Sequence, residues 1–213
     1  MKKSIIIGAG THGQVLCSYL READVNVIGF IDDSPDLVGK SVLGLPVMGT
    51  YNDLLTSEYQ ELIDDVYCPL GVNIIRVKYL SSLKALGYNT PSYIHPSVVI
   101  GPDVHLGEAI YMFPGNIIMP HTRIGNYFMM NTSSTVAHHT VIEEGVFLSS
   151  GVNIGALIRV KRCAFIGIGV TGMTGISVIG ESCLIGAGSV LIKDVPDKAV
   201  VVGNPGRIIR YKE

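Results

Sequence analysis

The stretch that decides the fold runs from Ile94 to Ile166 and reads IHPSVVIGPDVHLGEAIYMFPGNIIMPHTRIGNYFMMNTSSTVAHHTVIEEGVFLSSGVNIGALIRVKRCAFI. Every sixth residue in it is aliphatic. The positions in this register are Ile94, Ile100, Leu106, Met112, Ile118, Ile124, Met130, Val136, Ile142, Leu148, Ile154, Val160 and Ile166. A six-residue period predicts a parallel β-helix, in which each hexapeptide is a short strand plus a turn and three hexapeptides complete a coil. The aliphatic residue then points into the coil.

The register continues beyond Ile166 after a slip of one residue. The next aliphatic position is Ile179, thirteen residues on, and Ile185 and Leu191 follow at the regular interval. We therefore expect one extra residue to bulge out near residues 177–178. The repeats leave room for about five to six coils, which bury a continuous core only when they stack.

Composition and charge exclude several classes of protein. The formal net charge of −2 gives no signal for a nucleic-acid partner. Cys17, Cys68, Cys163 and Cys183 lack disulfide or metal-ligand spacing, which predicts a reducing cytoplasm and no bound metal. The apolar run 5–7 stops at Gly8, too early for a signal peptide or a membrane span.

The first 90 residues follow another pattern. Residues 4–7 predict a buried strand, and Gly8-Ala9-Gly10-Thr11-His12-Gly13 follows as a complete Gly-x-Gly-x-x-Gly motif. A helix, a strand over residues 25–31 and the pair Asp32-Asp33 come next. Such glycines let the backbone approach a phosphate at a helix N-terminus, and the acid can bind a ribose hydroxyl. The motif predicts a nucleotide site, and a glycine turn that only packs the βαβ unit is the alternative.

The chain is expected to form two domains. Residues 65–69 predict a third strand, after which Gly71 leads into a helix over residues 74–86. Residues 1–90 therefore predict a Rossmann-like α/β domain with a short parallel sheet, and residues 91–213 an all-β parallel β-helix with a C-terminal tail lying back along the rod. Because residues 1–90 are only half of a dinucleotide fold, NAD is a poor fit.

Taken together, the two halves resemble the NeuD/PglD-like family of sugar O- and N-acetyltransferases. The motifs that carry the resemblance are Gly8–Gly13, Asp32-Asp33, Gly71 before a helix, Asn131-Thr132-Ser133-Ser134, His138, Lys193-Asp194-Val195-Pro196 and Gly203-Asn204-Pro205. The resemblance implies a left-handed β-helix and a homotrimer. It also implies acetyl-CoA between adjacent rods and a nucleotide-linked amino sugar on the N-terminal domain.

The resemblance also assigns roles to single residues. It implies sugar-nucleotide contacts at Gly10, Thr11, His12, Asp32, Asp33 and Gly71. It implies catalytic roles for His138, as the general base, and for its neighbour His139. The residues it implies for the cofactor are Gly155, Ile168, Ala187 and Lys193. Lys193, with Arg207, either faces the phosphates of CoA or is ordinary surface charge.

Two positions depart from the family's pattern. An acidic residue commonly follows the base, and this chain has His139 there; some members have a second histidine where this chain has Phe147. Adjacent histidines repel each other when both are charged, which keeps one neutral as a base. Glu143 or Glu144 is a candidate to supply the missing carboxylate.

These observations lead to one preferred function and two alternatives. The preferred function is acetyl-CoA-dependent N-acetylation of a nucleotide-linked amino-deoxysugar for bacterial surface glycan synthesis, in which a base removes a proton as the amine attacks. The first alternative is O-acetylation of a sialic-acid-like sugar. The second is a catalytically degenerate trimer that binds a nucleotide sugar. None of the three requires a metal or a membrane.

Overall fold

The computed structural model describes residues 2–213, and the chain divides into two units, residues 1–93 and 94–213. The elements of the first unit are β1 (Ser4–Ile7), α1 (Thr11–Glu22), β2 (Val27–Ile31), β3 (Ser41–Val42), β4 (Leu45–Gly49), the 3-10 turn η1 (Asp53–Leu55), α2 (Ser57–Leu62), β5 (Asp65–Tyr67) and α3 (Asn73–Ala85).

The first unit is built on a sheet with the strand order β3-β4-β2-β1-β5. Its centre is β1, which pairs in parallel with β2 and β5 and whose side chains at Ile5, Ile6 and Ile7 are buried. β4 continues the parallel sheet beside β2, and the short β3 pairs antiparallel with β4. A strand buried on both faces reads as a continuous apolar run, which is why the sequence identified β1.

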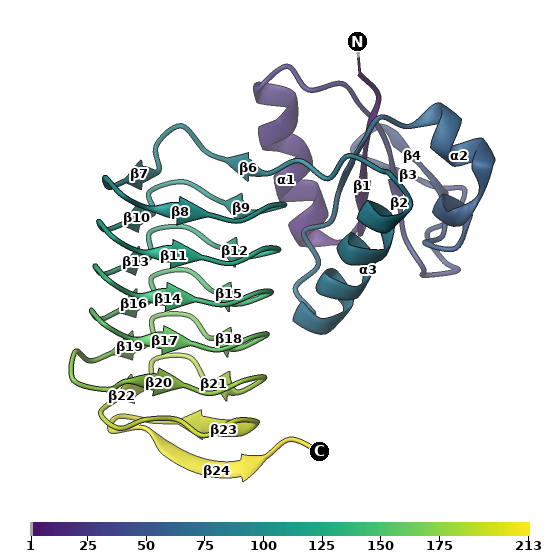
Figure 1. The fold of residues 1–213 in the computed structure, drawn as a ribbon. Coiled ribbons are helices and arrows are strands. Elements are labelled where there is room, and N and C mark those ends of the chain that lie inside the picture. Colours follow the sequence, from purple (N-terminus) through teal and green to yellow (C-terminus); the bar gives the residue numbers. More distant parts are fainter. Residues whose placement is uncertain (1) are drawn as a thin grey trace. The chain divides into compact units, whose positions relative to one another are not determined.

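The second unit is a stack of two-residue strands, which Figure 1 shows as columns of short arrows placed one below another. The strands are β6 (Tyr93–Ile94), β7 (Val99–Ile100), β8 (His105–Leu106), β9 (Tyr111–Met112), β10 (Ile117–Ile118), β11 (Arg123–Ile124), β12 (Met129–Met130), β13 (Thr135–Val136), β14 (Val141–Ile142), β15 (Phe147–Leu148), β16 (Asn153–Ile154), β17 (Arg159–Val160), β18 (Phe165–Ile166), β19 (Thr171–Gly172), β20 (Val178–Ile179), β21 (Leu184–Ile185) and β22 (Val190–Leu191). They form parallel sheets whose members recur every third strand, which is the arrangement of a parallel β-helix.

Three sheets make the walls of the coil among residues 94–213. The face β7-β10-β13-β16-β19-β22 is called face D, the face β8-β11-β14-β17-β20 is face E, and the face that contains β9, β12, β15, β18 and β21 is face C. The corner between face D and face E is the D–E corner, and the corner between face C and face D is the C–D corner. The candidate site residues of this unit lie at these corners.

The pairing register follows the six-residue period. Ile118 lies opposite Val136, and Val136 opposite Ile154, so equivalent residues are 18 apart in successive coils. All three are buried in a continuous aliphatic core, as the sequence predicts. Ile100 occupies the same register but is 40% exposed. It belongs to the first coil, where no earlier coil covers the end of the core.

The extra residue in the register lies between β19 and β20. Gly172 takes the inward position that the period assigns to it, and Val178 then pairs with Arg159, 19 residues earlier instead of 18. The carboxylate of Asp194 stabilises this irregular turn by accepting hydrogen bonds from the backbone N–H groups of Ser177, at 2.6 Å, and Val178, at 3.1 Å. The bulge therefore has its own polar support.

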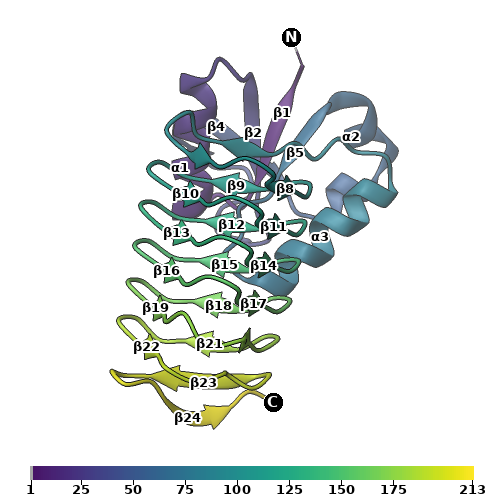
Figure 2. The ribbon, with the colours of Figure 1, turned by 60° about the vertical axis from the view of Figure 1, so that its left-hand side comes forward.

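The C-terminal segment differs from the expected tail. It does not lie back along the rod, because β23 (Ala199–Val202) extends face C by pairing in parallel with β21. β24 (Arg207–Tyr211) then pairs antiparallel with β23, and Figure 2 shows the two strands at the end of the stack. β24 thus pairs with the edge that β23 would otherwise leave open and is itself the last strand of face C. Among residues 2–213, no helix is long and apolar enough to cross a bilayer.

Candidate functional site

The glycine motif forms the turn between β1 and α1. Gly8 has a φ of +96°, a conformation that favours glycine, and Gly10 is the N-cap residue of α1. The first backbone N–H groups of α1 have no partner within the helix and point out of its N-terminus, where the helix dipole favours negative charge. The local geometry is therefore that of an anion-binding helix start.

The three glycines of the motif differ in what a side chain at each position would contact. A Cβ at Gly13 would lie 1.7 Å from the carbonyl oxygen of Gly8, so this position must be glycine for the helix to pack on the strand. A Cβ at Gly8 would lie 2.8 Å from Leu70. A Cβ at Gly10 meets no heavy atom within 4 Å. Gly8 and Gly13 therefore serve the fold, and Gly10 leaves open space beside the helix start.

The two acidic residues after β2 are engaged by the protein itself. Asp32 accepts hydrogen bonds from the backbone N–H groups of Ala9, at 2.8 Å, and Ser34, at 2.9 Å, which ties the glycine loop to the end of β2. Asp33 accepts one from the backbone N–H of Tyr51 at 2.8 Å. A carboxylate oxygen can accept two hydrogen bonds, so both side chains keep capacity for a ligand hydroxyl.

Tyr79 is a residue of this site that the sequence analysis missed. Its hydroxyl donates to the second carboxylate oxygen of Asp33 at 2.7 Å, and its ring stacks on Tyr51 with centroids 3.5 Å apart. Burial, and then the hydrogen bond to Asp33, raises the pKa of Tyr79, so the phenol stays protonated. Ile75, four residues earlier on α3, lines the same hollow. Residues four apart lie on one face of a helix, and this spacing was the only signal for Tyr79 in the sequence.

His12 lies beside Gly71 at the loop that follows β5. A Cβ on Gly71 would lie 3.5 Å from Nδ1 of His12. Burial lowers the pKa of His12, and the Arg76 guanidinium adds to this shift, so the imidazole is neutral near pH 7. Arg76 is fully buried and donates to the carbonyl oxygen of Leu70 at 2.5 Å, which fixes the Leu70–Gly71 backbone. Sequence reasoning did not find Arg76, because a buried cation looks like a surface residue in a helix.

All six predicted sugar-nucleotide residues line two hollows of about 210 Å³ each at this end of the sheet. One hollow includes Gly10, Thr11 and His12, the other includes Asp32, Asp33 and Tyr79, and Gly71 lines both. The hollows also share Gly8 and Leu70. This is the carboxyl edge of a parallel sheet, where α/β folds commonly bind ligands.

His138 and His139 lie at the D–E corner, directly after β13. Both are exposed, and their Nδ1 atoms are 3.0 Å apart, close enough for one hydrogen bond. The rings meet edge to face with centroids 5.1 Å apart. One of the two Nδ1 atoms must carry the proton, and the other must be the acceptor.

The candidate carboxylates near the base have other partners. Glu143 pairs with Arg159 at 2.6 Å, and Glu144 with Arg162 at 2.8 Å. Phe147, which stands where some relatives have a second histidine, is buried against Phe165 with ring centroids 5.1 Å apart. Neither glutamate is therefore free to assist His138, and Phe147 is a packing residue.

The cysteines are packing residues as well. Cys17, Cys68, Cys163 and Cys183, all within the described residues, are buried and unbonded to sulfur. Burial raises the pKa of Cys183 to about 12, so the thiol stays protonated and is a poor nucleophile near neutral pH. Within residues 2–213, no three ligating side chains lie close enough together to hold a metal ion.

The residues predicted for the cofactor occupy two corners of the coil. Gly155 and Lys193 lie at the D–E corner, in the column that also contains His138. Ile168 and Ala187 lie at the C–D corner in successive coils, where the N–H of Gly188 donates to the carbonyl oxygen of Ile168 at 2.8 Å. The strands of face D separate the two corners. A single chain therefore does not bring all four residues together.

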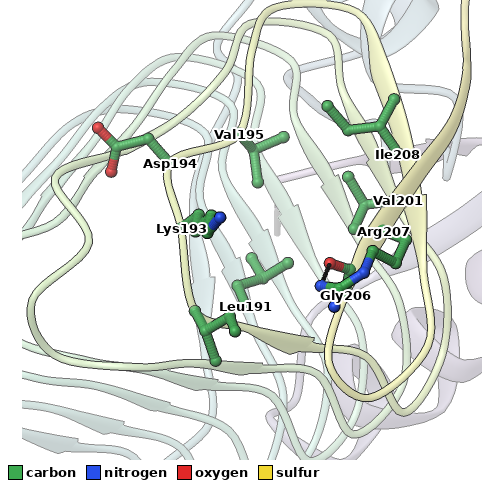
Figure 3. A pocket seen from close by; sticks show the side chains of 9 residues that line it. Leu191, Lys193, Asp194, Val195, Val201, Gly206, Arg207 and Ile208 are labelled. Atoms are coloured by element: carbon green, nitrogen blue, oxygen red, sulfur yellow. Dashed lines mark hydrogen bonds between the residues drawn. The ribbon is translucent and has the colours of Figure 1, made fainter.

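Lys193 also lines a hollow of about 410 Å³ at the C-terminal end of the β-helix (Figure 3). Its other charged lining residues are Asp194 and Arg207, and the apolar ones include Leu191 and Val201. The carboxylate of Asp194 is directed away from the other labelled side chains (Figure 3), because it bonds the turn before β20. The hollow therefore combines two cations with an apolar wall.

The N-terminal part of the chain resembles a known domain family. Its residues 3–83 match the PglD N-terminal domain. The matched part contains β1, α1 and most of α3, and thus every residue that lines the two hollows described above.

Solved structures extend the likeness to the whole chain. PerB from Caulobacter crescentus, crystallised with CoA and GDP-perosamine, is 28% identical with a TM-score of 0.90 over 99% of this chain and 98% of that one. The acetyltransferase domain of PglB from Neisseria gonorrhoeae is 28% identical with a TM-score of 0.87, over 98% and 100%. These matches confirm the predicted fold class, an α/β domain followed by a left-handed parallel β-helix, and the resemblance to NeuD/PglD-like acetyltransferases.

Curated relatives match shorter parts of the chain. A dTDP-3-amino-3,6-dideoxy-α-D-galactopyranose 3-N-acetyltransferase from Aneurinibacillus thermoaerophilus is 46% identical over 52 residues, which are 24% of this chain and 27% of that protein. Serine acetyltransferase 2 from Arabidopsis thaliana is 37% identical over 81 residues, 34% of this chain and 25% of the relative. The chain thus spans about a quarter of the length of these two relatives.

Proposed function

We propose that this protein is an acetyltransferase that moves the acetyl group of acetyl-CoA to the amino group of a nucleotide-linked amino-deoxysugar. The observation that carries the proposal is the end-to-end match with PerB, a GDP-perosamine N-acetyltransferase that holds CoA and GDP-perosamine in one structure. The match covers both units of the chain, and it therefore includes both parts for which a role is proposed here, nucleotide binding and acetyl transfer. A relative that acts on a dTDP-linked amino sugar supports the same substrate class.

His138 is proposed as the general base. It is exposed at a corner of the coil, where a substrate can reach it, and its Nδ1 is hydrogen bonded to a neighbouring imidazole, which leaves Nε2 to face a ligand. Imidazole suits this task near neutral pH because its ordinary pKa is about 6.5. As the amine attacks, Nε2 accepts its proton. Structures of PerB in which one histidine is replaced by alanine or asparagine still hold CoA and GDP-perosamine, so ligand binding and that histidine are separable there.

The glycine loop is proposed to bind the nucleotide. The open space at Gly10 and the helix start beside it suit a diphosphate. Asp32 and Asp33 keep acceptor capacity for hydroxyl or N–H groups of ribose or base, and the Tyr79 oxygen, whose hydrogen is donated to Asp33, adds a further acceptor. Neutral His12, with Thr11 and Gly71, is proposed to contact the remainder of the substrate.

The cofactor site is proposed to need a second copy of the chain. Ile168 and Ala187 lie at the C–D corner, and Gly155 and Lys193 at the D–E corner, so neighbouring copies packed through face D would bring the two sets together. Face D has exposed apolar side chains that suit such packing, at Val99, Ile117, Met119, Met173 and Ile192. A homotrimer of about 68 kDa, three times 22.8 kDa, is the closed assembly we propose. A monomer by light scattering at micromolar concentration would contradict it.

Lys193 and Arg207 are proposed to bind the phosphates of acetyl-CoA. They lie beside one hollow with an apolar wall, a combination that suits a nucleotide with charged phosphates. We also propose a cytoplasmic location, because the cysteines are free and acetyl-CoA and nucleotide sugars are cytoplasmic metabolites. Surface glycan synthesis is the proposed pathway, because activated amino sugars of this class are its building blocks.

One assay tests the proposed function. Purified protein is incubated with acetyl-CoA and a panel of UDP-, GDP- and dTDP-linked amino sugars, and released CoA thiol is followed. We expect release with at least one amino sugar, and none with the matched hydroxyl sugars. Release that depends on a sialic-acid-like hydroxyl substrate would favour O-acetylation. Tight nucleotide-sugar binding without thiol release would favour a catalytically degenerate binding protein.

A further inference from the structure

The D–E corner has a vertical column of residues in the left-handed conformation. Asp103, His121 and His139 occupy equivalent positions in three successive coils, with φ values of 56°, 63° and 57°. The N–H of His121 donates to the carbonyl oxygen of Pro102, and the N–H of His139 to that of Pro120, each at 3.2 Å. The backbone thus holds three polar side chains one above another on the edge of the β-helix.

The side chains of this column contact one another and reach the proposed base. Nδ1 of His121 is 3.5 Å from a carboxylate oxygen of Asp103. The rings of His121 and His139 pack with centroids 4.7 Å apart and a tilt of 43°. Nδ1 of His139 is 3.0 Å from Nδ1 of His138. A continuous row therefore runs from a carboxylate, through two imidazoles, to His138.

Proton placement along the row follows from the role of His138. If Nε2 of His138 accepts a proton from the substrate, its Nδ1 must already carry one. His138 donates that proton in a hydrogen bond to Nδ1 of His139, so the single ring proton of neutral His139 is on Nε2. When Nε2 of His138 takes up the substrate proton, the positive charge is shared with His139 through the Nδ1–H···Nδ1 bond. A negative group near His139 would stabilise that charge.

We propose that Asp103 and His121 are positioning residues for the His138–His139 pair. His121 packs on the ring of His139 and holds it against His138, while Asp103 orients His121 and supplies the negative charge of the row. This inference rests on the proposed function, with His138 as the base. It explains how the chain works without an acidic residue directly after the base, since Glu143 and Glu144 are bound to arginines.

The exposure of the row limits the size of the effect. The side chain of His121 is 50% exposed and that of Asp103 is 70% exposed, so water screens their interaction. Exposed pairs of this kind contribute little, and we expect Asp103→Asn or His121→Asn to lower kcat by about threefold to tenfold. Asparagine is the replacement of choice because it tolerates a positive φ better than most residues. The KM values for both substrates should not change.

A double-mutant cycle distinguishes this role from a structural one. His139→Asp places a carboxylate directly beside His138, which should make the rest of the row dispensable. We therefore expect Asp103→Asn to slow wild-type enzyme but to have no effect on kcat in the His139→Asp background. A merely structural role for Asp103 would produce the same loss in both backgrounds, and that result would overturn the proposal.

Two controls keep the outcome interpretable. Asp197→Asn removes another exposed carboxylate, 53% exposed against 70% for Asp103, which pairs with Lys161 at 3.0 Å at another corner, and it should leave kcat unchanged. Circular dichroism and light scattering check that each variant keeps its fold and assembly. Wild-type kcat in both Asp103→Asn and His121→Asn would refute the inference while leaving the proposed function intact. Full activity of His138→Ala would instead refute the assignment of the base.

Discussion

The N-terminal α/β domain and the β-helix present their candidate ligand residues in different ways. In the domain, residues from three separate segments, at positions 10–12, 32–33 and 71, converge on two adjoining hollows within one chain. In the β-helix, the candidate residues are spread along two corners that face D separates. The proposed nucleotide site is formed by residues of one chain, whereas the proposed cofactor site requires another copy to supply the opposite corner.

The difference follows from the two folds. The carboxyl ends of parallel strands meet at one edge of a sheet, so loops from distant parts of the sequence gather there. A coil repeats the same three corners at every level, so residues 18 apart stack in columns and residues on different corners stay apart. Substitutions should therefore separate the two regions, with nucleotide binding lost in one and chemistry or acetyl-CoA binding lost in the other.

The largest effect is expected from His138→Ala. Loss of the general base should lower kcat by about 10²–10⁴-fold, while calorimetry shows unchanged binding of the sugar nucleotide and of acetyl-CoA. His105→Ala, an exposed histidine on face E, is the matched control and should retain full activity. If His139→Ala abolishes turnover and His138→Ala does not, the base is the other histidine of the pair.

The next largest effect is a difference in stability between alanine substitutions at two glycines of the same motif. Gly13→Ala places a Cβ 1.7 Å from a backbone carbonyl oxygen, and we expect it to cost at least about 3 kcal/mol of stability. Gly10→Ala meets no atom within 4 Å and should cost about 1 kcal/mol or less. Chemical denaturation of both variants measures the difference. Equal stability of the two would mean that the loop rearranges around Gly13.

A bulkier residue at Gly10 tests the nucleotide site directly. Gly10→Val should weaken sugar-nucleotide binding by about tenfold or more, because the side chain fills the space beside the helix start. Acetyl-CoA binding, measured by calorimetry on the same preparation, should be unchanged. An equal loss for both ligands would show that the domain only supports folding.

A smaller effect is expected at the C-terminal end of the β-helix. Lys193→Ala should weaken acetyl-CoA binding by about threefold to tenfold, and the loss should shrink at high salt because an exposed cation is screened. Sugar-nucleotide binding should not change. Lys198→Ala, which removes another exposed lysine near the same end, serves as the control. Identical affinities of wild type and Lys193→Ala would mean that Lys193 is ordinary surface charge.

The smallest effect is expected in the pH dependence of stability, through His12 in the N-terminal domain. Because the pKa of His12 is lowered in the folded state, the unfolded chain takes up a proton near the ordinary value of about 6.5 while the folded chain does not. Stability should therefore be highest above about pH 6.5 and fall as the pH drops below it. Thermal unfolding at pH 7.5 and 5.5 should show a smaller acid loss in His12→Gln than in wild type. Equal losses would contradict a lowered pKa.

Sequence reasoning was strongest where a local rule repeats. The six-residue period identified the inward positions of the β-helix, because each coil uses the same turn and the same alternation of faces. It also located the extra residue before β20. It could not determine how the C-terminal segment ends, since pairing of β24 with β23 depends on which edge is open. We expected a tail along the rod and found a hairpin.

The candidate site was less accessible from the sequence. The glycine motif predicted the helix start, but it did not distinguish Gly10 from Gly13, because the clash with Gly8 appears only in three dimensions. Tyr79 on α3 lies 46 residues from Asp33, to which it donates, and the sequence does not show that Arg76 on the same helix is fully buried. The row from Asp103 to His138 joins residues 18 apart on stacked corners, so it becomes visible only when the coils are placed in register.

The central claim is that one chain joins a nucleotide-linked amine to the acetyl group of acetyl-CoA. Its most direct test is to supply acetyl-CoA labelled with carbon-13 in the acetyl group, together with the best amino-sugar nucleotide of the panel, and to locate the label by NMR. The account predicts that the label appears in an amide on the intact nucleotide sugar and resists mild base. A label found in a base-labile ester, or remaining entirely on CoA, would contradict it.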